Sequence, residues 1–300
     1  MKAPLPMIDG VSPCCQWLPP GPWKTILGFL EERHCRVEIS TWLSRMARGQ
    51  VVDESGHPLN SESPYRVGSC IYYYREIQSE KSIPFPETIL YQDDHLLVVD
   101  KPHFVPVVPS GRFLHETLLV RLRKKGGLES LVPMHRIDRE AAGVVLFSLN
   151  PATRGQYASL FQTRNVKKVY EALAGTLPSL SFPMTRRSRI AAGEPFFRMK
   201  EVEGEPNSET YIEVLEKMND VTRYQMTPVT GRKHQIRLHL SGLGIPIVND
   251  KLYPVMKPAE DDDFSSPLQL LAKSISFHDP LTGQERCYES MRALHCGEVT

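Results

Sequence analysis

The C-terminal two thirds of the chain mix strand-like and helix-like segments without a regular strand–helix–strand alternation. Apolar or alternating runs typical of strands occur at 96–100, 143–149, 168–174, 209–215 and 221–227. Two further runs, 268–277 and 286–289, flank a turn and are expected to form a late hairpin. This order predicts an α+β fold built on a mixed, mostly antiparallel sheet with flanking helices.

Three helices are expected among these strands: one that carries Leu114 to Leu122 on one face and ends at Gly126-Gly127, and two at 150–165 and 233–240. Asn150 followed by Pro151 is a strong helix start, because Asn can cap the first N–H groups and proline needs none at the first helical position. The helices therefore fall between the strands and are expected to flank the sheet.

The N-terminal part has a different pattern. Residues 1–22 are proline-rich and are expected to be a loose tail. Residues 23–84 carry two helical patterns, then short strand-like runs and a polar linker, and this order resembles an S4-type RNA-binding module. A small domain that only braces the large one is the alternative. Residues 85–300 would then be the large domain.

The segment His135-Arg136-Ile137-Asp138-Arg139 places one carboxylate between two guanidinium groups. Opposite charges within a few ångströms favour the ionised form of an acid. Asp138 is therefore expected to stay ionised, as a nucleophile, a base or a structural counter-ion.

This segment resembles the catalytic motif of the RluA-type pseudouridine synthases, which reads His-Arg-Leu-Asp-Arg. Further matches follow in the family's order at Leu96–Pro102, Lys168–Ala172, Gly231–His239 and Gly244–Asp250. One departure is Ala141-Ala142, where the family usually has Thr and Ser, so this loop is expected to have lost polar contacts. The resemblance implies an RNA-modifying isomerase with an α+β fold and no cofactor.

The resemblance also implies roles for individual residues. Asp138 would act at the ribose, Tyr170 would stack on the uracil and move the C5 proton, and Arg237 would hold Asp138 in a bidentate ion pair. Arg136 could fill the gap left by a flipped nucleotide, while His135 and His234 are interpreted as loop-fixing hydrogen-bonding residues. The expected substrate- and RNA-binding residues are Arg136, Arg139, His135, Arg232, His234, Arg123, Lys124, Lys167 and Lys168.

The charge distribution favours RNA more than the net charge of +1 does. Between Arg112 and His239 there are 21 Lys+Arg and 13 Asp+Glu, an excess of 21 − 13 = +8, while acid gathers at residues 260–263. A basic region beside the candidate site is typical of a groove that follows a phosphate backbone. RNA, ribosomal or transfer, is therefore the expected partner.

Other sequence features exclude some classes of protein. No apolar run approaches the ~18 residues of a membrane span, and the N-terminus lacks the pattern of a secretory signal. The six cysteines form no metal-ligand spacing, so free thiols in a reducing cytosol and no metal site are expected. The protein is also expected to be cytoplasmic and monomeric.

Two other functions remain possible from the residues. A non-catalytic RNA-binding protein on the same scaffold would fit the Ala141-Ala142 departure, although it would not need an arginine-paired acid. A glycosidase acting on a small nucleoside would need a second carboxylate, for which only Glu140 is near. The sequence leaves open which RNA and which uridine is modified. It also leaves open whether Asp138 adds to the sugar or removes a sugar proton.

Overall fold

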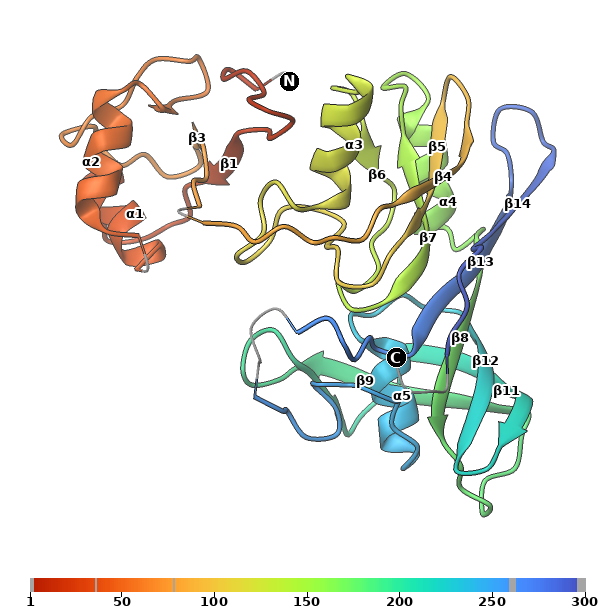
Figure 1. The fold of residues 1–300 in the computed structure, drawn as a ribbon. Helices are drawn as coiled ribbons and strands as arrows, with labels where there is room; N and C mark the ends of the chain where they lie inside the picture. The colour runs from red at the N-terminus through yellow and green to blue at the C-terminus, as the bar shows by residue number, and fades with distance from the viewer. Residues whose placement is uncertain (1–2, 36, 78, 259–262, 296–300) are drawn as a thin grey trace. The chain divides into compact units, whose positions relative to one another are not determined.

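The structure of the chain is a computed structural model that describes residues 3–35, 37–77, 79–258 and 263–295. Most of the acidic cluster expected at 260–263, and Cys296, lie outside the described residues. The chain divides into two compact units (Figure 1). The N-terminal unit comprises Met1–Glu80 and Gly111–His115, and the C-terminal unit comprises Lys81–Ser110 and Glu116–Thr300.

The N-terminal unit contains two short helices and a three-stranded sheet. Its core brings Phe29 and Leu30 of α1 against Trp42 and Met46 of α2. The sheet order is β1-β3-β2, and both pairings are antiparallel. The bounds are α1 (Ile26–Arg33), α2 (Ile39–Ala47), β1 (Cys14–Trp17), β2 (Val51–Val52) and β3 (Cys70–Tyr73).

Two expectations for this unit are wrong. Residues 1–22 are not wholly a loose tail, because β1 pairs with β3 and Leu18 is buried in the core. The cysteines are not all free thiols, because a disulfide joins Cys15 to Cys70. The likeness to an S4-type module stays a prediction.

The C-terminal unit is built on one large sheet, which confirms the expected α+β class. The strand order is β10-β9-β11-β12-β8-β13-β7-β5-β4, with β14 beside β13 and β6 beside β7. Only the β13–β7 pair is parallel among the described strands. The bounds are β4 (Thr88–Gln92), β5 (Leu96–Lys101), β6 (Val132–Pro133), β7 (Ala142–Ser148), β8 (Lys167–Gly175), β9 (Met184–Ala192), β10 (Met199–Val202), β11 (Ser208–Met218), β12 (Val221–Pro228), β13 (Leu270–His278) and β14 (Glu285–Glu289).

Three helices accompany this sheet: α3 (Leu118–Gly126), α4 (Arg154–Gln162) and α5 (Gln235–Gly242). Tyr157 of α4 packs on strands β5 and β7, and α5 lies against β9, β10 and β11 (Figure 1). The sheet therefore has two separate cores, one under α4 and one that includes Ile236 and Leu240 of α5. Within the described residues, no helix is long and apolar enough to cross a membrane.

All three helices of this unit begin later than the sequence indicated, α5 by two residues. Helix α3 starts after Thr117, whose hydroxyl caps the Val120 N–H, so Leu114 is outside it. Helix α4 starts at Arg154, because the Asn150 side chain accepts a hydrogen bond from the Ala152 N–H and makes a local turn instead. Asn150-Pro151 therefore forms a turn that precedes helix α4 and does not begin the helix itself.

Candidate active site

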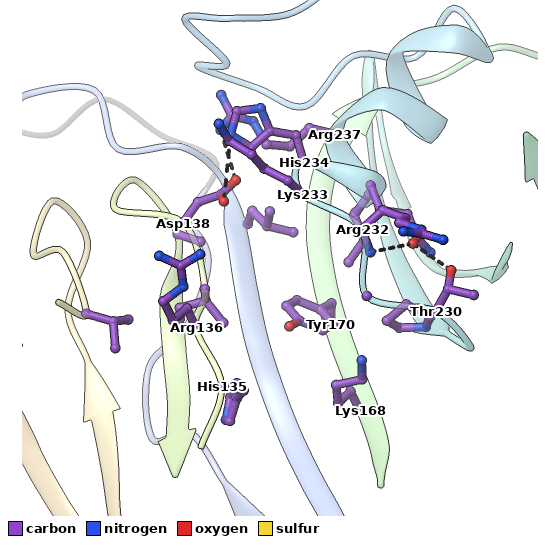
Figure 2. A pocket seen from close by; sticks show the side chains of 18 of the residues that line it. His135, Arg136, Asp138, Lys168, Tyr170, Thr230, Arg232, Lys233, His234 and Arg237 are labelled. Carbon is purple, nitrogen blue, oxygen red and sulfur yellow. Dashed lines mark hydrogen bonds and ion pairs between the residues drawn. The ribbon is translucent and has the colours of Figure 1, made fainter. Parts of the chain in front are cut away.

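A cavity of about 750 Å³ lies within the C-terminal unit, between the halves of the large sheet. Its walls come from the loop between β6 and β7, the start of β8, and the segment from the end of β12 into α5 (Figure 2). Three segments that are distant in the sequence therefore meet around one space.

Asp138 lies in the loop between β6 and β7, and two side chains near the end of β5 hold the backbone of that loop. The buried Lys101 ammonium donates to the carbonyl oxygen of Arg139 at 3.1 Å. The His103 Nδ1–H donates to the carbonyl oxygen of Glu140 at 2.6 Å. The backbone on the C-terminal side of Asp138 is therefore held by two side chains from the segment that ends β5.

Gly143 explains how the loop passes into β7. Its φ is +117°, and a Cβ at this position would lie 2.2 Å from the carbonyl oxygen of Ala272 on β13. Only glycine lets the two parallel strands approach this closely. Ala141 and Ala142 beside it are buried, so the Thr and Ser of the family pattern would face protein at these positions. The polar contacts that this loop is expected to have lost would therefore be contacts with protein groups.

Arg237 of α5 joins two carboxylates. Its Nη1 donates to Asp138 Oδ2 at 3.0 Å, while its Nε and Nη2 donate to Asp250 Oδ2 and Oδ1 at 2.8 and 2.7 Å. The expected bidentate fork therefore exists, but it is made with Asp250, and Asp138 receives a single hydrogen bond. Sequence reasoning had given Asp250 only an uncertain bracing role.

The charge of Arg237 is secure in this arrangement. Burial would lower the pKa of Arg237, but its hydrogen bonds to Asp250 and the charge of Asp138 outweigh burial, so the pKa is raised. The Arg237 side chain is 1% exposed, while that of Asp138 is 24% exposed to the cavity. A permanent cation thus lies behind a carboxylate that remains open to a ligand.

The second oxygen of Asp138 is not bound by Arg237. His234 Nε2 lies 3.9 Å from Asp138 Oδ1, beyond hydrogen-bond distance (Figure 2). Burial lowers the pKa of His234, although the charge of Asp138 opposes the shift. The imidazole is therefore a neutral neighbour of Oδ1 at neutral pH.

Tyr170 lines the cavity from β8, and its ring packs on the core formed by α5 and the sheet. Burial, and then the charge of Asp138, raise the pKa of Tyr170 well above its ordinary value. The phenol therefore stays protonated at neutral pH and can donate a hydrogen bond without adding a second negative charge beside Asp138.

His135 and Arg139 also line the cavity, but each contacts protein. His135 Nε2 accepts a hydrogen bond from the Leu146 N–H at 3.1 Å, and burial lowers the pKa of His135 to about 3. Arg139 pairs with Glu140 at 3.0 Å. Both side chains therefore support the loop that carries Asp138.

The expected RNA-binding residues separate into two groups. Arg136, Lys168 and Arg232 line the cavity with the residues above (Figure 2). Arg164 and Lys233, which were not among the expected binding residues, line it as well. The other expected residues, Arg123, Lys124 and Lys167, are not part of the cavity lining.

Two contributing residues were missed from the sequence, Lys101 and Tyr253. Lys101 stands in the matched segment Leu96–Pro102, but its burial and its hydrogen bond to the Arg139 carbonyl oxygen depend on tertiary structure. Tyr253 gave no signal, because its contact with His234 depends on tertiary structure. Among the described residues, no group of three or more His, Cys, Asp or Glu side chains could hold a metal ion.

Comparison with known proteins gives one consistent result. The family model described as RNA pseudouridylate synthase matches residues 95–242. The dual-specificity RNA pseudouridine synthase RluA of Haemophilus influenzae is 32% identical over 206 residues, 67% of this chain and 91% of that protein. An uncharacterized RNA pseudouridine synthase of Synechocystis is 28% identical over 76% of this chain and 79% of that protein. The solved structure of human RNA pseudouridylate synthase domain containing 1 has a TM-score of 0.57 and 27% identity, covering 71% of this chain and 86% of that one.

Proposed function

This chain belongs to the RluA-type family of RNA pseudouridine synthases and is an isomerase, and from that premise we propose how it acts. We propose that it converts specific uridines of structured ribosomal or transfer RNA to pseudouridine, with Asp138 as the catalytic carboxylate. The observation that carries this proposal is the open Asp138 carboxylate, paired with a buried arginine inside a cavity that Tyr170 also lines.

The reaction breaks the N1–C1′ bond of uridine, turns the base and joins C5 to C1′, while C5 loses one proton and N1 gains one, directly or through solvent. The atoms balance without an oxidant, a reductant or a nucleotide. A carboxylate is needed near C1′ or C2′, and Asp138 Oδ1 is the oxygen that Arg237 leaves open. This oxygen is therefore our candidate for the atom that meets the ribose.

Arg237 keeps this carboxylate ionised. A fixed cation next to an acid favours its charged form, and no reorganisation is needed when the substrate arrives. Asp250 holds the guanidinium in place, so the distance between Arg237 and Asp138 does not depend on a flexible side chain.

Tyr170 would keep the detached base in the cavity. When the N1–C1′ bond breaks, negative charge develops on the uracil, and a protonated phenol can donate a hydrogen bond to it. The ring lies on the cavity wall where a base could stack, and the phenol oxygen would manage the proton at C5.

RNA binding is supported by cations that have no protein partner. Within the described part of the chain, no ion pair or hydrogen bond occupies the side chains of Arg136, Arg164, Lys168 and Lys233 around the cavity. Such cations are suited to RNA phosphates. We also propose a monomer that acts on flipped uridines in cytoplasmic RNA.

The test has two parts. Pseudouridines are mapped in total RNA from cells with and without this gene, and the purified protein is then assayed on the RNA that loses a site. Asp138→Asn should abolish turnover while RNA binding and folding persist, because the amide keeps the shape without the charge. Asp220→Asn, in the exposed turn between β11 and β12, is the matched control and should keep full activity. Measurable turnover by Asp138→Asn would refute its catalytic role.

A further inference from the structure

His234 has a backbone conformation that L-residues rarely adopt. Its φ is +57° at the start of α5, and its side chain is only 8% exposed. A left-handed non-glycine residue at a site is held there by its surroundings, and such strain often accompanies function. The contacts of its two ring nitrogens show what this conformation achieves.

Tyr253 contacts the inner nitrogen of this ring. The Tyr253 hydroxyl lies 2.8 Å from His234 Nδ1 and accepts a hydrogen bond from the Met199 N–H at 2.8 Å. A backbone N–H can only donate, so the phenol keeps its own proton free for another acceptor. The Tyr253 hydroxyl has these two partners among the described residues, and of the two only His234 Nδ1 can accept a hydrogen bond.

Two properties of Tyr253 make it a dependable donor. Two guanidinium groups contact its ring, with the Arg198 and Arg237 Cζ atoms 5.2 and 5.4 Å from the ring centroid. Burial raises the pKa of the Tyr253 phenol, so it remains protonated at neutral pH. The donor is therefore fixed both in position and in protonation.

A neutral imidazole that accepts a hydrogen bond at Nδ1 carries its proton on Nε2. This nitrogen is the one that lies 3.9 Å from Asp138 Oδ1. The charged groups that act on His234 are Asp138, Arg237, Lys233 and Glu140, of mixed sign, and burial is the largest influence on its charge.

We propose that Tyr253 fixes His234 as the Nε2–H tautomer, and that His234 is a positioning residue which presents a neutral donor to Asp138 Oδ1 in the working enzyme. Arg237 would hold Oδ2 and His234 would orient Oδ1. A neutral donor directs this oxygen without adding a second positive charge. Such a charge would make the carboxylate less reactive, whether Asp138 adds to the ribose or removes a ribose proton. The inference rests on the proposed function of Asp138, although the tautomer does not.

The tautomer is tested first, by long-range ¹H–¹⁵N correlation spectra of the full chain labelled at histidine nitrogens. The spectrum at neutral pH should show His234 as Nε2–H, assigned by the signal that disappears in His234→Gln. In Tyr253→Phe the two tautomers should become mixed. An Nδ1–H tautomer or an imidazolium in the wild-type protein would overturn the assignment.

Kinetics tests the positioning role. Tyr253→Phe should lower kcat about ten-fold, the scale on which partners that orient a functional histidine act. Its KM for RNA should stay within about two-fold, because no RNA contact is removed. Tyr224→Phe is the matched control, since this buried hydroxyl donates to the Gly175 carbonyl oxygen and should leave kcat unchanged. An unchanged kcat in Tyr253→Phe would overturn the role.

A conservative pair separates positioning from folding. His234→Gln can still present an N–H to Asp138, whereas His234→Leu cannot, and both suffer the same backbone strain. Glutamine should therefore retain several-fold more kcat than leucine, and equal losses would count against the proposal. A wild-type protein that is inactive on every RNA would instead refute the proposed function, while the spectra would still report the tautomer.

Discussion

Replacing Arg237 by methionine removes one cation from two carboxylates at once, and the two should respond differently. The Asp250 side chain is 1% exposed and receives two hydrogen bonds from Arg237, whereas Asp138 is 24% exposed and receives one. Breaking a buried ion pair by removing one partner costs about 3–5 kcal/mol. We expect a loss of that size in the free energy of unfolding, caused mainly by Asp250.

The second substitution identifies which carboxylate is responsible. Asp250→Asn in the Arg237→Met background should recover about 2–3 kcal/mol, because an amide needs no counter-ion and can still accept from the Leu252 and Tyr253 N–H groups. Asp138→Asn should recover less than about 1 kcal/mol, because its carboxylate can be hydrated from the cavity. If Arg237 made its bidentate pair with Asp138, as the sequence indicated, Asp138→Asn would be the substitution that restores stability. Because the pair is made with Asp250, we expect Asp250→Asn to restore it instead.

The assay must report on the correct unit. All three tryptophans, Trp17, Trp23 and Trp42, lie in the N-terminal unit, so their fluorescence follows a part of the chain without Arg237. Urea unfolding is therefore followed by far-ultraviolet circular dichroism, with tryptophan fluorescence as an internal control that should not shift. Two separate units also make a single transition unsafe to assume.

The result that would refute this reasoning is strict additivity of Arg237→Met and Asp250→Asn. Every variant without Arg237 should also be inactive, including the one whose stability Asp250→Asn restores. The loss of kcat should be about 10²–10³-fold, the scale for removing one donor that stabilises developing charge. An active, restabilised double variant would show that Arg237 acts only in folding.

The remaining predictions concern the cavity and its pH dependence. Tyr170→Phe should bind RNA like the wild type but stall before release of the C5 proton, measured by tritium release from [5-³H]uridine RNA; equal activity of Tyr170→Leu would instead indicate core packing. Lys168→Ala and Arg136→Ala should each reduce the salt dependence of RNA binding by roughly 0.7–0.9 in the log–log slope, with Lys217→Ala, an exposed lysine of β11 outside the cavity lining, as the control; unchanged slopes would remove both residues from the RNA path. Burial lowers the pKa of His135 to about 3, so between pH 6.5 and 3 the unfolded chain binds a proton at this histidine that the folded chain does not. The free energy of unfolding should therefore decrease as the pH is lowered from about 6.5 to about 3, and less steeply in His135→Gln. Identical pH profiles for the two proteins would contradict this.

The pairing of Asp138 with Arg237 could be predicted from the sequence, although 99 residues separate them. The prediction came from short motifs whose residue types suit one reaction. The strands at 96–101 and 168–174 were also found, because buried strands leave strong apolar or alternating patterns. Elements that leave a pattern in a short stretch of sequence could therefore be predicted.

The structure differs where a partner is chosen by tertiary geometry. A guanidinium has several donors, and nothing in the sequence determines that Arg237 makes its fork with Asp250 and a single bond with Asp138. Strand β9 was missed because its run is polar and rich in arginine, and β10 because it has only four residues with a charged pair at its centre. Burial of Ala141 and Ala142 could not be predicted without knowing how β7 meets β13.

The division of Arg237 between two acids has a consequence for the chemistry. If Asp138 had the bidentate fork, the guanidinium charge would hold both of its oxygens, and both would be weaker towards the ribose. Because Asp250 takes Nε and Nη2, only Nη1 remains for Asp138, and Oδ1 stays open to the cavity. A lysine could not replace this arrangement, since a single ammonium has no fixed set of donors to divide between two carboxylates. The buried Asp250 thus allows one arginine to keep Asp138 charged while leaving one of its oxygens available for the reaction.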